Sequence, residues 1–359
     1  FTKIVAKNFD INLNLDDIQE YKKIIKKLNL AKPILVKNTN INFFNGKEII
    51  ATINKSSIKF KDFNNINIRG NFLNDELLFN LEGSKNEPKI FVIKLIESKI
   101  LAKININTNN AQDKIQGDIL FKKNKHRLRS PFSYKNNHIF FEKADIRNDF
   151  LNGEFDGFIK FLPFFDFNLN VDLKGFNFKR FYTFISNTDK KAISEFLKIN
   201  YKINGELNLN VAKVYSKYDL INSFESYIKL SNGIILIEKM LLHLGKLGAA
   251  DLTGAIKSDK KFTNFRFENN IYIDTEKYFN RKFGIFSDNG IYESLYLSGN
   301  LDLSNFTIRF NEISGDKKLN EKKIFLKEKE FNDYMLSDAY VSFFDFSRFK
   351  EFLKSVLSN

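Results

Sequence analysis

Hydrophobic and polar residues alternate along most of this chain. In 203-INGELNLNVAKV-214, leucine and valine take every second position after an Asn-Gly turn, and glutamate and asparagine fill the positions between. The same pattern recurs in 115-IQGDILFKK-123, 168-NLNVDLKGFNF-178 and 296-YLSGNLDLSNFTIRF-310. Because successive side chains of a strand point to opposite faces, these segments predict strands with one apolar and one polar face.

Turn signals such as Asn-Gly, Asp-Gly and Asn-Asp separate the alternating segments at intervals of about 8 to 15 residues. This spacing favours hairpins joined in series over βαβ units, which need a long crossover between parallel strands. We therefore expect a mainly β protein with a long antiparallel, curled sheet, forming a groove or half-barrel, and a few amphipathic helices.

Helical periodicity interrupts the strands in three places. The segments 15–29 and 345–358 carry apolar residues at helical spacing, and 178–198 holds two shorter helical stretches. The charged segment 314–335 predicts a loop followed by a short helix. We place a domain boundary at the helical interruption near 185–200, between a β-rich region with an N-terminal helix (1–185) and a second β region ending in a helix (186–359).

The apolar parity of the strands is the candidate binding surface. A sheet with one dry face must cover it, and few strands are apolar on both parities, as the central strands of a sandwich would be. We expect the apolar face to be wide and only partly self-covered, with Leu207, Leu209 and Val211 on the same face as Leu169, Val171 and Leu173, and with Asn208 and Asn210 facing water. The candidate groove residues are Leu169, Val171, Leu173, Leu207, Leu209, Val211, Leu301 and Leu303.

Composition adds little to this picture. Lysine, asparagine, isoleucine and phenylalanine dominate, which we interpret as the mark of an AT-rich bacterial genome. The formal net charge is +14, but the lysines are spread along the chain and 122-KKNKHRLR-129 is the densest basic segment. Nucleic-acid binders cluster arginine for bidentate contacts, so we expect no nucleic-acid partner. The absence of cysteine excludes disulfides and thiolate metal sites.

Motifs for catalysis are not found. The three histidines, His126, His138 and His243, lack metal-ligand spacing, and neither a nucleophile elbow nor a phosphate-binding glycine loop is present. We expect no enzyme activity, no cofactor and no metal.

The segment 200–273 resembles the AsmA-like family of bacterial envelope proteins, which includes TamB and its relatives. The strand INGELNLNV, the pair SYIKLSNGIILIEKMLLHLGKLG and the segment AADLTGAI carry the resemblance, and 298-SGNLDLSNFTIRF-310 and the helical tail extend it.

The resemblance implies a periplasmic protein anchored in the inner membrane of a Gram-negative bacterium by a segment outside this chain. It further implies a long β-groove of the bridge-like lipid-transfer type, which binds phospholipid acyl chains and moves lipid for outer-membrane biogenesis. Membrane surfaces and envelope proteins are the other partners it suggests.

Other interpretations follow from the same alternation. An outer-membrane barrel would have strands of about 10 residues with aromatic girdles. An adhesin-like domain would have short regular repeats. Either would be a non-catalytic β-structural envelope protein without lipid transport.

Overall fold

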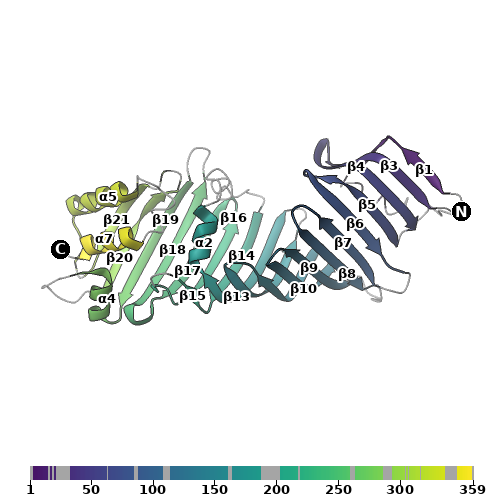
Figure 1. Cartoon of the computed structure of the whole chain (residues 1–359). Helices are drawn as coiled ribbons and strands as arrows, with labels where there is room; N and C mark the ends of the chain where they lie inside the picture. Colours follow the sequence, from purple (N-terminus) through teal and green to yellow (C-terminus); the bar gives the residue numbers. More distant parts are fainter. Residues whose placement is uncertain are drawn as a thin grey trace. The chain divides into compact units, whose positions relative to one another are not determined.

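The computed structural model describes residues 3–357 except for several segments. Outside the description lie 1–2, 15–16, 18–19, 22–32, 63, 85–87, 108–113, 161–163, 187–202, 217–218, 259–262, 286–292, 304, 306, 316, 336–345 and 358–359. The described chain is mainly β, as the alternation predicts. Its strands belong to one mixed sheet of 21 strands that is not closed, and helices are few (Figure 1).

Two compact units divide the chain, Phe1–Arg147 (unit 1) and Asn148–Asn359 (unit 2). The sequence placed the boundary near 185–200 instead. In the structure this segment connects two strands that pair directly with each other within unit 2. The loss of strand periodicity there marks a crossover connection rather than the end of a unit.

Unit 1 consists of strands that follow one another across the sheet. The first two strands both pair parallel with the third, and from the third onward each strand pairs antiparallel with the next. The strands are β1 (Ile4–Lys7), β2 (Asp10–Asn14), β3 (Ile34–Asn45), β4 (Glu48–Asp62), β5 (Asn65–Phe72), β6 (Asp75–Glu82), β7 (Lys89–Leu95), β8 (Ile100–Asn107), β9 (Ile115–Lys123), β10 (His126–Lys135) and β11 (His138–Arg147).

Unit 2 follows the same plan and adds helices (Figure 1). Its strands are β12 (Leu151–Lys160), β13 (Phe165–Asn177), β14 (Ile203–Val211), β15 (Val214–Tyr215), β16 (Ser223–Ser231), β17 (Ile234–His243), β18 (Gly248–Ser258), β19 (Thr263–Ile273), β20 (Ser294–Asp302) and β21 (Thr307–Ser314). Its helices are α2 (Phe178–Ser186), the 3-10 turn η2 (Gly245–Leu247), α4 (Glu276–Phe283), α5 (Glu321–Met335) and α7 (Phe346–Leu357).

The sheet is mainly antiparallel, as expected, but each unit also contains parallel pairs that the sequence did not predict. β2 and β3 pair parallel, and so do β13 and β14. In both places a long connection separates the paired strands, residues 15–33 and residues 178–202. Parallel neighbours need such a connection because the chain must return to the starting edge before it repeats the same direction. The helical interruptions in the sequence are therefore the crossovers that the hairpin interpretation left out.

The helix predictions have mixed outcomes. α7 confirms the helix predicted over 345–358, α5 confirms a helix within 314–335, and α2 confirms the first half of 178–198. The rest of 178–198, and nearly all of 15–29, lie outside the described residues. α4 was not predicted, although Glu276 in its first turn and a left-handed Gly284 just after its end are ordinary helix-boundary signals.

The main core of unit 2 lies where α4, α5 and α7 cover the last strands of the sheet (Figure 1). Phe310 of β21 stacks on Phe352 of α7, with ring centroids 5.6 Å apart, and Phe331 of α5 meets Phe352 edge-on at 5.2 Å. Phe279 of α4 is 1% exposed. The aromatic contacts join α5 and α7 to β21, and Phe279 of α4 belongs to the same buried cluster.

Candidate functional site

The candidate site is the apolar face of the sheet in unit 2, between α2 and the helix-covered core. β13 and β14 pair parallel so that Leu169 lies opposite Leu207, Val171 opposite Leu209, and Leu173 opposite Val211. The predicted shared face, including the adjacency of the two strands, is confirmed. Asn208 and Asn210 are exposed on the other face, as expected.

Strand register extends these pairs into apolar rows that run across the sheet. Each row takes one residue from each of β12, β13, β14, β16, β17 and β18. The first row is Gly157, Leu169, Leu207, Ile228, Ile237 and Gly254, the second is Phe155, Val171, Leu209, Ser226, Met240 and Leu252, and the third is Gly153, Leu173, Val211, Phe224, Leu242 and Ala250. Each row crosses five strand spacings of about 4.8 Å, or roughly 24 Å.

Burial divides the eight predicted groove residues into two classes. Leu169, Val171, Leu207 and Leu209 are half-buried. The other four are buried or packed against a core: Leu173 (5% exposed), Val211 (0%), Leu301 (3%) and Leu303, which is partly buried against the α4–α5–α7 core. Sequence periodicity placed all eight on one face, but it could not tell which part of that face the helices cover.

An aromatic cluster occupies the α2 end of the face. The ring of Phe176 at the end of β13 lies 5.2 Å from Phe181 of α2 and 6.3 Å from Phe224 of β16. Phe150 also contacts Phe181, at 5.5 Å. Leu173 and Val211, at this end of β13 and β14, are more buried than Leu169, Val171, Leu207 and Leu209.

Phe167 lies at the other end of the apolar face, near the starts of β13 and β14. A Cβ at Gly205 would lie 2.5 Å from the Phe167 ring, so the ring covers the position where β14 would otherwise carry a side chain. The accessible part of the face is therefore the centre of the first two rows, which we call the open apolar face and define as Leu169, Val171, Leu207, Leu209 and Ile228.

One polar group lies among these apolar residues. The Ser226 side chain is opposite Leu209 in the second row, is 6% exposed, and its hydroxyl has no hydrogen-bond partner among the described residues. Neither Ser226 nor the row partners Ile228, Ile237 and Met240 were among the sequence candidates. The alternation in 224-FESYIKL-230 was the available signal, but it does not reveal which strand is adjacent.

Asparagine and acidic side chains form a ladder on the polar face of the same strands. The Asn208 side-chain amide donates to Asn170 Oδ1 at 2.9 Å, and Asn170 donates in turn to Asp156 Oδ1 at 2.9 Å. Asn210 donates to Asp172 Oδ1 at 3.2 Å. The alternating asparagines therefore fix the parallel register from the wet side, and this register aligns the leucines on the dry side.

Unit 1 carries an apolar row of its own. Register connects one residue from each of ten strands: Ala6, Val36, Ile58, Ile68, Phe79, Ile93, Ala102, Phe121, Leu128 and Ile146. Its buried cluster is small, with Ile41, Ile53 and Leu77 at the centre and a ring of partly buried residues around them. In the described part of unit 1, the helical residues are Asp17, Glu20 and Tyr21, in the connection between β2 and β3.

The described residues show no arrangement suited to metal binding and no helix long and apolar enough to cross a bilayer. A search of known protein families found no match to the chain, and no curated protein matched it either.

Proposed function

We propose that the open apolar face binds lipid acyl chains and that the protein serves lipid transfer rather than catalysis. The observation that carries the proposal is the half-burial of Leu169, Val171, Leu207 and Leu209 in rows that cross six neighbouring strands. Apolar residues in this number, neither sealed in a core nor scattered singly, are characteristic of binding surfaces.

The energetics favour an acyl chain as the occupant. Burial of one methylene contributes about 0.8 kcal/mol, so a 16-carbon chain gains roughly 12 kcal/mol before the cost of ordering it. This gross free-energy gain is similar to the gain of the same acyl chain from its burial in a bilayer. Leu169, Leu207 and Ile228 follow one another in the first row with similar aliphatic side chains, so a bound acyl chain loses little free energy when it slides between these strands.

The resemblance of residues 200–273 to AsmA-like envelope proteins supports the same function. We accordingly propose a periplasmic location, an inner-membrane anchor outside this chain, and a role in supplying lipid for outer-membrane biogenesis. Membrane surfaces and envelope proteins are the proposed partners beyond the lipid itself.

Photo-crosslinking tests the proposal directly. A photoreactive amino acid at position 209 lies on the open apolar face. At position 208, the adjacent residue of the same strand, the side chain points to the opposite face of the sheet and into water. We expect phospholipid to be captured from position 209 and not from position 208, with native mass spectrometry of detergent-free protein identifying the adduct. Equal capture from both positions, or none from position 209, contradicts the proposal and leaves a purely structural β protein.

A further inference from the structure

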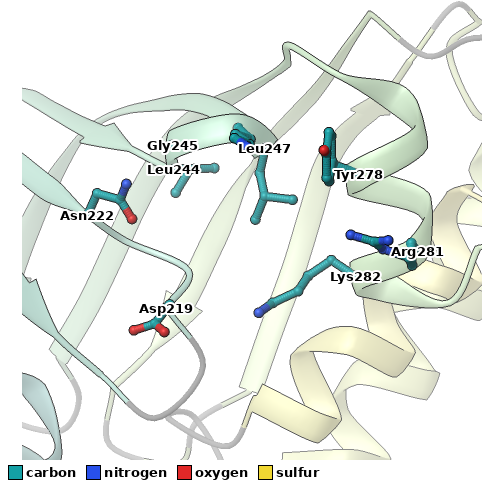
Figure 2. Close-up of a pocket in the computed structure, with 9 residues that line it drawn as sticks. Asp219, Asn222, Leu244, Gly245, Leu247, Tyr278, Arg281 and Lys282 are labelled. Carbon is teal, nitrogen blue, oxygen red and sulfur yellow. The ribbon is translucent and has the colours of Figure 1, made fainter.

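A pocket of about 370 Å³ lies at one end of the strands in unit 2, where three segments meet (Figure 2). The connection before β16 contributes Asp219 and Asn222. The η2 turn and the residue before it contribute Leu244–Leu247, and α4 contributes Tyr278, Arg281 and Lys282. Leu247 is buried in the α4–α5–α7 core, so the pocket has an apolar floor next to its charged wall.

Positive charge predominates in this pocket. Lys246, Arg281 and Lys282 contribute three cations, against a single carboxylate from Asp219. Figure 2 shows the Arg281 and Lys282 side chains extending from α4 across the pocket, with Lys282 directed toward Asp219. Asp219 therefore balances one of the three cations at most.

Tyr278 contacts both of the other two cations. Lys246 Nζ is 5.4 Å from the centre of the Tyr278 ring, and Arg281 Cζ is 5.2 Å from the same centre. Each cation gains a modest attraction from the ring face. Among the described residues, neither cation forms an ion pair with a carboxylate.

We propose that this pocket binds the phosphate group of an amphiphilic phosphate ester, with a phospholipid headgroup as the ligand that fits the proposed function on which this inference rests. A guanidinium and an ammonium group that line the same pocket match the several oxygens of a phosphate. The apolar floor formed by Leu244 and Leu247 accommodates the carbon part of the ester. An inorganic anion alone would leave that floor unused.

The test compares two pairs of substitutions that remove equal charge. The site variant is Lys246→Gln with Arg281→Gln. The control variant is Lys257→Gln with Lys277→Gln, which removes two exposed cations from β18 and α4 outside the pocket. Circular dichroism and thermal unfolding establish that both variants are folded before any binding is measured.

Two probes distinguish the sources of the phosphate. Vesicles of phosphatidylcholine with and without phosphatidylglycerol test a headgroup in a membrane, and glycerol 3-phosphate, titrated by calorimetry, tests a soluble ester. Both are used at 150 mM salt to suppress diffuse attraction. We expect the site variant to bind phosphatidylglycerol vesicles at least about tenfold more weakly than the wild type, and the control to change by less than about twofold.

Each outcome decides a separate question. Equal losses in the two variants, or no binding of either probe by the wild type, overturn the pocket proposal. A tenfold loss for glycerol 3-phosphate with no effect on vesicles supports a phosphate site but excludes the lipid headgroup. Lipid capture from position 209 is measured in parallel. If it fails while the pocket still binds phosphate, the proposed function fails and the phosphate site stands.

Discussion

Leu209 of β14 lies directly opposite Val171 of β13 in a parallel register, and both side chains are half-buried on the same face of the sheet. Val171 and Leu209 are the residues that β13 and β14 contribute to the second row, within the open apolar face. The pair is therefore the most direct place to interfere with binding.

Leu209→Asp is expected to abolish lipid capture on the open apolar face. An unpaired carboxylate in an apolar surface costs several kcal/mol when a lipid chain covers it. The measurement is copurified phospholipid per protein by native mass spectrometry. Leu209→Ala provides a milder variant in case the aspartate prevents folding, and it should reduce capture without abolishing it.

The matched control is Asn208→Asp, one residue away on the wet face. It loses the hydrogen bond that Asn208 donates to Asn170, which contributes about 0.5–1.5 kcal/mol to stability. Lipid capture should nevertheless remain at the wild-type level. A loss of lipid equal to that of Leu209→Asp would show that the effect comes from general destabilisation and not from the apolar face.

Asp75 is expected to make the stability of unit 1 sensitive to acid. Its carboxylate accepts backbone N–H bonds from Glu97 at 2.9 Å and Ser98 at 2.8 Å, which connects β6 to the turn between β7 and β8. Burial favours the neutral acid, but the hydrogen bonds from Ser98 and Glu97 outweigh it and lower the pKa of Asp75 to about 2. Because the pKa is lowered in the folded state, the stabilisation is complete above the unfolded value near 3.9 and is lost as the pH falls from about 4 to about 2.

Urea unfolding of the wild type and of Asp75→Asn between pH 2 and pH 6 checks this prediction. The asparagine keeps one acceptor oxygen but loses the charge, so the variant should be less stable at pH 6 and should converge with the wild type near pH 2. Asp118→Asn, at an exposed position on β9, serves as the control. A constant stability difference across the pH range would contradict the assignment to Asp75.

Much of the fold was predictable because strand periodicity is local. Alternation identified the strands and placed Leu207, Leu209 and Val211 on one face, since a period of two depends only on the backbone of that strand. It also gave the pairing with Leu169, Val171 and Leu173, because both segments carry the same order of apolar and polar residues. The pairing direction was harder, since identical alternation is compatible with parallel and antiparallel neighbours.

The extent of coverage was not predictable from the same pattern. Leu301 and Leu207 have equivalent positions in similar sequences, yet Leu301 is 3% exposed under the terminal helices while Leu207 is half-buried. The difference arises from tertiary contacts with α4, α5 and α7, which are distant in sequence. The cationic pocket was missed for the same reason, because Lys246 and Arg281 come together only through Tyr278.

Phe352→Ala is expected to release the terminal helices and enlarge the open apolar face. The ring stacks on Phe310 and meets Phe331 edge-on, and Phe352 is 3% exposed. Its truncation should cost about 3–5 kcal/mol. Glu351→Ala, an exposed neighbour on α7, should change stability by less than about 0.5 kcal/mol. The measurements are thermal unfolding and binding of a dye that reports exposed apolar surface. Similar effects of the two variants would show that α7 does not pack as described.

The last prediction concerns the outer edge of β21. Two side chains of α5 bond to its backbone: Glu328 accepts from the Phe310 N–H at 2.7 Å, while Asn332 accepts from the Ile308 N–H at 2.8 Å and donates to the Ile308 carbonyl at 3.1 Å. Exposed strand edges pair with other chains, so these contacts seal the edge against a further strand. The double variant Glu328→Leu with Asn332→Leu leaves the same backbone groups unpaired, at about 1–3 kcal/mol each.

The double variant Glu328→Leu with Asn332→Leu should self-associate through β21. Light scattering would detect a concentration-dependent increase in mass, and thioflavin fluorescence would rise. The control substitution is Lys329→Leu, which adds the same apolar side chain at an exposed position of α5 between the two sealing residues. If added hydrophobicity alone drives association, the control associates as well, and the sealing role is wrong. If the control stays monomeric while the double variant does not, the hydrogen bonds from Glu328 and Asn332 are what keep this edge from accepting another strand.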